Sequence, residues 1–249
     1  MKIHNLLRTG SVAALASFTL ALMLSLPAGT AAAGEPHQLT SEEKAAGWKL
    51  LFDGESLNGW RGYRKDAPPA AGWTVRDGLL HKIRGERGGD IITAEKFDDF
   101  ELYWEWRVES GGNNGVKYLV TEERPSAPGH EYQMLDDQRH PDSAGGAKRL
   151  TASFYDVLAP IADRPVKPAG EWNASRIIIQ GNRVEHWLNG VRVLEYELGS
   201  ASLREALQAS KFRNSERFGE KISGHIMLTD HNDATWFRNL KIRPIDGAR

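Results

Sequence analysis

The stretch Phe100-Glu101-Leu102-Tyr103-Trp104-Glu105-Trp106-Arg107-Val108 determines the class of fold. Every second residue is apolar, and the residues between are charged or amphipathic. This strict alternation predicts a strand with one face against a core. Many shorter apolar segments, separated by turn residues, surround it. We therefore predict an all-β protein, an antiparallel β-sandwich of the jelly-roll type with one or two short helices.

Turn signals divide the rest of the chain into hairpins. Asp77-Gly78 separates two short apolar runs and predicts a two-residue turn. Residues 172–198 read as a three-stranded meander with turns at Gly181-Asn182 and Asn189-Gly190. Ser202 and Glu205 have the spacing of a capping box, which predicts a helix from Ser202 to about Ser210. Two last strands are expected over residues 224–230 and 235–242.

The N-terminal residues have the pattern of an export signal. Lys2 and Arg8 precede an apolar run over residues 12–26, and small residues at 31–33 offer a cleavage site. We expect residues 1–33 to be a signal peptide and residues 34–47 to be a lead-in with a short helix from Thr40 to Gly47. The folded domain is expected over residues 48–245. The mature protein would be periplasmic or extracellular, without a membrane anchor.

Composition narrows the class of partner. The formal net charge is −1, whereas nucleic-acid-binding proteins are usually strongly basic. We therefore expect no nucleic-acid partner. The chain contains no cysteine, so it forms no disulfide and has no thiol nucleophile.

The densest group of polar residues runs from Gly129 to His140. In an extended chain Glu131 and Gln133 share one face with Leu135, and Tyr132 and Met134 share the other. One interpretation is a strand that carries a functional site and ends in an acidic turn. The alternative is a surface strand that runs into a solvated loop.

Three further polar clusters accompany this segment. The first is a Gly/Asn run over residues 111–115, which is by default a turn and leads to Lys117; the others lie at residues 185–189 and 229–233. His186 in the second of these clusters is either a core histidine or a functional one. Carboxylates and imidazoles in such clusters suit proton transfer, and they also suit a divalent metal ion. Spacing alone does not distinguish these two chemistries, and no standard catalytic motif is present.

Taken in order, many short motifs resemble the 3-keto-disaccharide hydrolase domain family, long catalogued as a domain of unknown function. The resemblance covers the chain from about Trp48 to Pro244. The matching segments are Leu50-Leu51-Phe52-Asp53-Gly54-Glu55-Ser56-Leu57-Asn58-Gly59-Trp60, Gly112-Asn113-Asn114-Gly115-Val116-Lys117-Tyr118, Glu131-Tyr132-Gln133, Val184-Glu185-His186-Trp187-Leu188-Asn189-Gly190 and Asp230-His231.

The resemblance implies a concanavalin-like (LamG-like) sandwich acting on a small carbohydrate, a glycoside already oxidised to a ketone at sugar carbon 3. Such a ketone acidifies the hydrogen on carbon 2, so a base can remove it and expel the aglycone; water then adds. This route requires a base, an acid and an electrophile for the keto oxygen.

We assign roles on matched positions, as hypotheses. Glu131, Asp136 and His231 are the candidates for base or acid. Lys117 or a bound divalent cation would stabilise the enolate, and the candidate metal ligands are Asp136, His140 and Asp230. The candidate substrate contacts are Asn113, Tyr103, Gln133 and His186.

Two rival interpretations use the same scaffold, because a fold does not fix a function. A non-catalytic carbohydrate-binding module would present exposed aromatic platforms without an acid/base cluster. A structural or adhesion domain would be accompanied by further modules or an anchor.

Overall fold

The computed structural model describes residue 1 and residues 37–124 and 127–245. The predicted signal peptide, residues 1–33, lies outside the described residues after Met1. In the described part of the chain, no helix has both the length and the apolar character needed to cross a membrane.

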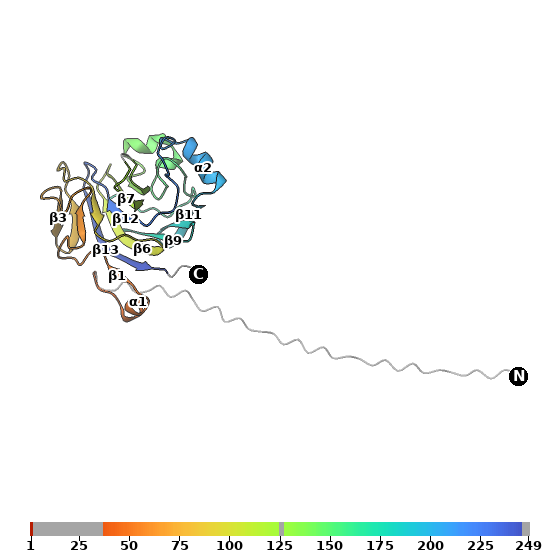
Figure 1. Cartoon of the computed structure of the whole chain (residues 1–249), viewed down its shortest axis with the longest axis horizontal. Helices are drawn as coiled ribbons and strands as arrows, with labels where there is room; N and C mark the ends of the chain where they lie inside the picture. The colour runs from red at the N-terminus through yellow and green to blue at the C-terminus, as the bar shows by residue number, and fades with distance from the viewer. Residues whose placement is uncertain (2–36, 125–126, 246–249) are drawn as a thin grey trace. The chain divides into compact units, whose positions relative to one another are not determined.

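The described residues form the predicted antiparallel sandwich, with an eight-stranded and a five-stranded sheet (Figure 1). The larger sheet has the strand order β11-β10-β9-β6-β13-β4-β3, with β1 also paired to β13, and the smaller has the order β2-β5-β12-β7-β8. The strands of the larger sheet are β1 (Lys49–Leu50), β3 (Trp73–Arg76), β4 (Leu79–Lys82), β6 (Phe100–Val108), β9 (Asn173–Gln180), β10 (Arg183–Leu188), β11 (Val191–Glu197) and β13 (Thr235–Pro244). Those of the smaller sheet are β2 (Trp60–Gly62), β5 (Ile91–Thr93), β7 (Asn113–Val120), β8 (His130–Leu135) and β12 (His225–Leu228).

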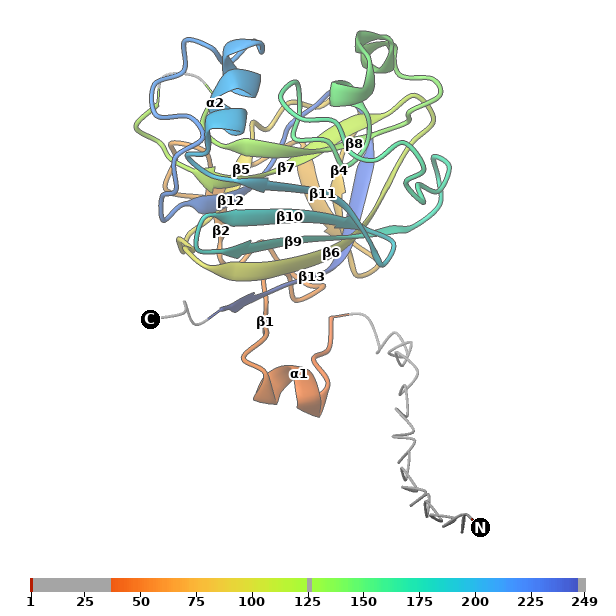
Figure 2. The same cartoon turned by 90° about the vertical axis from the view of Figure 1, so that its right-hand side faces the viewer.

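The predicted strands are confirmed, and the residues at the hairpin turns account for the turn geometry. Arg76 pairs with Leu79, which leaves Asp77 and Gly78 as a two-residue turn. Both have positive φ, 52° and 72°, as this tight turn requires. The meander is β9, β10 and β11, which lie side by side in Figure 2. The Gly/Asn run is a turn only in part, because Asn113 already begins β7.

In the described residues, four short helices accompany the sheets. They are α1 (Ser41–Ala45), α2 (Ala201–Gln208) and two 3-10 helices, η1 (Pro141–Gly145) and η2 (Ala147–Arg149). The predicted N-terminal helix is confirmed, with Thr40 as its cap. The predicted capping residue of α2 is wrong by two positions, because the Ser200 side chain, and not that of Ser202, accepts the backbone N–H of Leu203. In both views α2 and the green η1 lie on the same side of the sheets (Figures 1 and 2).

The polar face of β6 is not solvated. Glu101 and Glu105 are buried beneath arginine side chains from neighbouring strands. Glu101 pairs with Arg243 at 2.6 Å, and Glu105 pairs with Arg238 at 2.6 Å. The alternation predicted the strand correctly, but the long arginine side chains that cover its outer face come from β13 and β9.

A chain of buried hydrogen bonds crosses the core between the two sheets. The His186 ring donates from Nδ1 to the Ala152 carbonyl oxygen at 2.9 Å, since that carbonyl can only accept. The neutral ring then accepts at Nε2 from the Tyr118 hydroxyl at 2.7 Å. Tyr118 accepts in turn from Tyr196 at 2.7 Å, and the Tyr196 oxygen accepts from His130 Nδ1 at 2.8 Å. The single carbonyl therefore fixes the direction of the whole chain, and His186 is a core histidine.

This network makes stability sensitive to acid. Burial lowers the pKa of His186 from 6.5 to about 4. Between these two pH values the unfolded chain binds more protons than the folded one, so the free energy of unfolding falls as pH drops below 6.5. At pH 4 this contribution amounts to about 3 kcal/mol, at roughly 1.4 kcal/mol for each pKa unit.

We predict that His186→Gln, which removes this titration, flattens the dependence of unfolding free energy on pH between 7 and 4. Urea denaturation at several pH values measures it. Equal slopes in the two proteins would show that His186 does not hold a lowered pKa.

Candidate functional site

The pairing of β7 with β8 brings two predicted site residues together. Lys117 lies directly opposite Glu131, and opposed residues in an antiparallel pair point to the same face. Their neighbours Val116 and Tyr132 belong to the core, so Lys117 and Glu131 point outward from the five-stranded sheet. Lys117 Nζ lies 3.7 Å from Glu131 Oε2, and the side chains are only 18% and 10% exposed. The pair is thus largely desolvated, which strengthens its electrostatic interactions.

A glycine provides the space for this carboxylate. Gly115 lies two residues before Lys117, on the same outward face. A Cβ atom at this position would lie 2.3 Å from Glu131 Oε1, closer than two such atoms can approach. Any side chain at position 115 would therefore displace the Glu131 carboxylate.

Glu131 and Lys117 line a pocket of about 340 Å³, which we call the Glu131 pocket. Its remaining walls come from two distant segments, the loop before β8 and the loop after α2. The lining residues are Lys117, Ala127, Pro128, Gly129, Glu131, Lys211, Phe212 and Ser215. The volume is within the range of pockets that bind small molecules.

Lys211 is a site residue that the sequence analysis missed. Its backbone N–H donates to Asp156 Oδ2 at 2.8 Å, and its Nζ lies 4.0 Å from the centre of the Tyr155 ring. Burial lowers the pKa of this ammonium, and the negative charges of Glu131 and Asp156 oppose the effect. A single lysine after a helix gives no sequence signal of a functional site. Lys211 joins the site only because its loop folds over β8.

Two amide side chains continue the outward row beyond Glu131. Gln133 follows Glu131 by two residues on β8, and Asn113 lies two residues before Gly115 on β7. Gln133 Oε1 and Asn113 Oδ1 are both buried and have no hydrogen-bond partner among the described residues. Buried acceptors are rarely left unsatisfied, so each oxygen requires a donor from outside the described residues, either an ordered water molecule or a ligand hydroxyl.

The β12–β13 turn closes the Asn113 end of this row. Asp233 Oδ2 accepts the Asn113 backbone N–H at 3.1 Å and lies 3.9 Å from His140 Nε2. His231, half-buried, belongs to the same turn. The structure therefore places His140 and His231 near the end of the row that carries Asn113.

Asp136 does not join this row. Its Oδ2 accepts the Gly111 backbone N–H at 2.7 Å, and its Oδ1 accepts the Gln138 N–H at 3.1 Å. The side chain thus joins two turns, and both of its oxygens are engaged in doing so. This arrangement explains its position after β8 without a role in proton transfer.

Asp230 is likewise engaged elsewhere. Its Oδ1 lies 2.8 Å from Nζ of the fully buried Lys82. Its Oδ2 accepts the backbone N–H groups of Gly88 and Gly89 at 2.8 and 2.6 Å. The carboxylate therefore neutralises a buried charge and fixes a loop.

The candidate metal ligands do not fit a metal ion. Asp136 is engaged in its turn, and Asp230 is paired with Lys82. Within the described ranges, no three Asp, Glu, His or Cys side chains gather as a metal site would require.

Two predicted sugar contacts lie far from the Glu131 pocket in the fold. Tyr103 pairs with Lys241 on β13 and Arg176 on β9, and it lies on the outer face of the eight-stranded sheet. Its hydroxyl donates to Glu105 at 3.1 Å. His186 is enclosed in the core by the hydrogen bonds described above. The structure brings neither residue to the outward row of β7 and β8.

Comparisons with known proteins identify the family of the chain. A model of the 3-keto-alpha-glucoside-1,2-lyase-like domain matches residues 47–243. The chain is 38% identical over 248 residues to a protein from Bacteroides thetaiotaomicron named 3-keto-disaccharide hydrolase, and the alignment covers 86% of this chain and 84% of that protein.

Two solved structures, both of proposed glycosyl hydrolases from Parabacteroides distasonis ATCC 8503, share the fold. One has 31% sequence identity and a TM-score of 0.77, and covers 85% of this chain and 100% of its own. The other has 26% identity and a TM-score of 0.65, and covers 80% of this chain and 99% of its own.

The buried Lys82–Asp230 pair predicts that Asp230 stabilises the fold. Asp230→Asn leaves the buried Lys82 ammonium without its counter-charge, so we expect the free energy of unfolding to fall by about 3–5 kcal/mol. Urea denaturation measures the change, with Asp77→Asn, whose side chain is 85% exposed, as the matched control. A fully stable Asp230→Asn protein would contradict this structural role.

Proposed function

This chain belongs to the 3-keto-alpha-glucoside-1,2-lyase-like domain family, and we propose that Glu131 and Lys117 are its catalytic base and electrophile. The chain is a glycoside-cleaving enzyme that acts on 3-keto sugars. One observation carries the assignment of residues. The desolvated Glu131–Lys117 pair faces a pocket and is continued by two unpartnered amide oxygens.

The proposed reaction is elimination followed by hydration. A carboxylate removes the proton from carbon 2, and the electron pair moves onto the keto oxygen as an enolate. Collapse of the enolate forms the double bond between carbons 1 and 2 and breaks the bond from carbon 1 to the aglycone oxygen, which takes up a proton. Water then adds its hydroxyl to carbon 1 and a proton to carbon 2. The net result is hydrolysis without an oxocarbenium-like transition state.

Glu131 is suited to the first step. Its carboxylate opens into the pocket, and Gly115 gives it room to approach a bound ring. Lys117, beside it, places a positive charge where the enolate oxygen develops its negative charge. Such a fixed charge in a site with little water stabilises the transition state without reorganisation.

Lys211 is suited to protonate the leaving oxygen. It lies across the same pocket from the β7–β8 row, on a separate loop. Its pKa is lowered by burial, so it releases a proton more readily than a solvated lysine. In this assignment Lys211 takes the acid role for which Asp136 and His231 are the candidates from sequence.

The amide row is suited to hold the oxidised ring. Gln133 Oε1 and Asn113 Oδ1 would accept hydrogen bonds from sugar hydroxyls, which satisfies both orphaned acceptors. The glycosidic bond would then lie near Glu131, at the end of the row. A small carbohydrate is the expected ligand.

We also propose that the enzyme is exported to the periplasm or the medium. The support is the sequence pattern of residues 1–33, with its basic start, apolar run and small residues.

Removal of the base tests the assignment. We predict that Glu131→Gln lowers kcat/KM toward a 3-keto-glucoside by at least about 10²-fold, because the amide cannot accept the carbon-2 proton. Release of the free aglycone measures the rate. Glu195→Gln, on the outer face of the other sheet, serves as the matched control.

A smaller loss in Glu131→Gln would exclude Glu131 as the base. Binding of the 3-keto-glucoside by the unsubstituted protein without turnover would favour a carbohydrate-binding module.

The cation that stabilises the enolate is tested separately. We predict that Lys117→Met lowers kcat by about 10²–10³-fold, the usual effect of removing one electrostatic stabiliser, and that a chelator leaves the unsubstituted enzyme active. Steady-state kinetics with and without EDTA measures both. Loss of turnover in EDTA, restored by a divalent metal, would assign the enolate to a bound cation.

A further inference from the structure

A second pocket adjoins the Glu131 pocket. It has a volume of about 470 Å³, and we call it the Arg124 pocket. The lining residues are Lys96, Thr121, Glu123, Arg124, Asn214, Ser215, Glu216, Arg217, Ile222 and Ser223. Ser215 lines both pockets, so the two are neighbours across one residue of the loop after α2.

Arg124 joins the walls of the two pockets. Its guanidinium donates from one nitrogen to the carbonyl oxygen of Pro128, in the wall of the Glu131 pocket, at 3.3 Å. From another it donates to the carbonyl oxygen of Arg217, in the wall of the Arg124 pocket, at 2.8 Å. The side chain is thus fixed where the two pockets meet.

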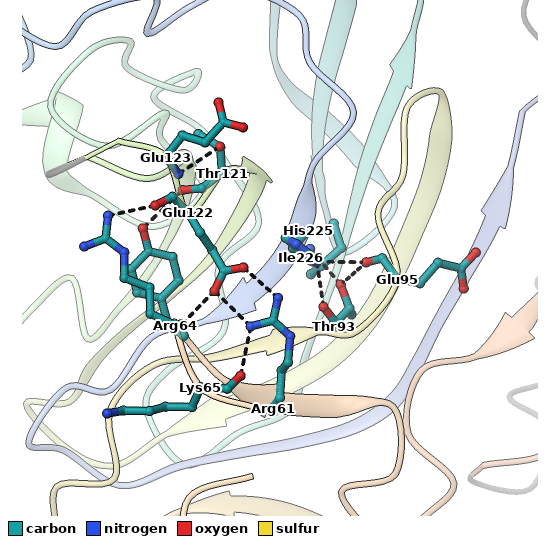
Figure 3. Close-up of polar contacts among 11 residues, drawn as sticks. Arg61, Arg64, Lys65, Thr93, Glu95, Thr121, Glu122, Glu123, His225 and Ile226 are labelled. Atoms are coloured by element: carbon teal, nitrogen blue, oxygen red, sulfur yellow. Dashed lines mark hydrogen bonds and ion pairs between the residues drawn. The ribbon is translucent and has the colours of Figure 1, made fainter. Parts of the chain in front are cut away.

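The segment that follows β7 lines the Arg124 pocket, and hydrogen bonds to Arg61 and Arg64 fix it in place. The carboxylate of Glu122 accepts two hydrogen bonds from Arg61, at 2.9 and 2.7 Å, and one from the Arg64 backbone N–H at 2.7 Å (Figure 3). Arg64 also donates to the Glu122 carbonyl oxygen at 2.8 Å. Glu123 and Thr121 therefore have a fixed backbone on either side of Glu122, as a pre-formed binding wall requires.

The chemistry of the Arg124 pocket suits a neutral polyhydroxylated ligand. Its lining mixes hydroxyl and amide groups with three cationic and two acidic side chains, so it carries little net charge. Such groups both donate to and accept from hydroxyls. A strongly anionic ligand would find Glu123 and Glu216 in the same pocket.

We propose that the Arg124 pocket binds the departing sugar of a 3-keto-disaccharide. The inference rests on the proposed function, which places the oxidised ring over Gln133 and Asn113. Glu131 and Lys117 then lie between the two sugars, beside the bond that breaks. Asn214, exposed on the loop after α2, is a specificity-determining residue in this arrangement.

The test compares two substrates that differ only in the leaving group, methyl 3-keto-glucoside and a 3-keto-glucosyl-glucose. Asn214→Trp fills the pocket, and Asn58→Trp makes the same change at an exposed residue that lines neither pocket. We expect Asn214→Trp to lower the ratio of kcat/KM for the disaccharide to that for the methyl glycoside by at least about 10-fold. Asn58→Trp leaves this ratio unchanged.

An equal loss for both substrates, or no loss, in Asn214→Trp would overturn the proposal while the proposed function stands. Failure of the unsubstituted protein to cleave either substrate would instead refute the proposed function. In that case, a measurement of disaccharide binding tests the Arg124 pocket without turnover. By calorimetry, Asn214→Trp in a Glu131→Gln background should weaken the affinity for the disaccharide by about 10-fold relative to Glu131→Gln. An unchanged affinity would refute the pocket as a sugar site.

Discussion

The antiparallel pairing of β7 with β8 is the interaction on which the site depends. Its register places Lys117 opposite Glu131 and Gly115 opposite Gln133. Because side chains alternate between faces, a slip of β8 by one residue would turn Tyr132 outward, point Glu131 into the core and separate Glu131 from Lys117. Core packing and the chemistry of the site therefore require the same register.

The core reinforces this register from the inside. Tyr118 on β7 bonds to both His186 and Tyr196 on the opposite sheet, and His130 on β8 bonds to Tyr196. These bonds have directions, set by the carbonyl oxygen of Ala152, and so they specify position more closely than apolar contacts do. The outward side chains of β7 and β8 are rigid because their inward neighbours cannot shift without breaking the network.

The two outer faces of the sandwich differ in what covers them. On the eight-stranded sheet, arginines from β9 and β13 pair with Glu101 and Glu105, so the carboxylates there are neutralised. On the five-stranded sheet, the loop after α2 contributes Lys211 over a row that retains two unpartnered amide oxygens. An acidic residue on a half-buried strand is therefore structural on one face and available for chemistry on the other.

The sequence by itself determined the all-β class, most strands apart from β2, β5 and β7, and the tight hairpin at Asp77-Gly78, because alternation and turn residues are local signals. It also named Glu131, Gln133, Lys117 and Asn113 as candidate site residues, since they lie in motifs that resemble one family. Only the tertiary structure separated them from Tyr103, Asp136 and Asp230, which have the same chemistry in sequence but engage partners within the fold. It alone brought Lys211 to the β7–β8 row and Arg217 to Arg124, because contacts between residues far apart in the chain follow from packing and leave no local pattern.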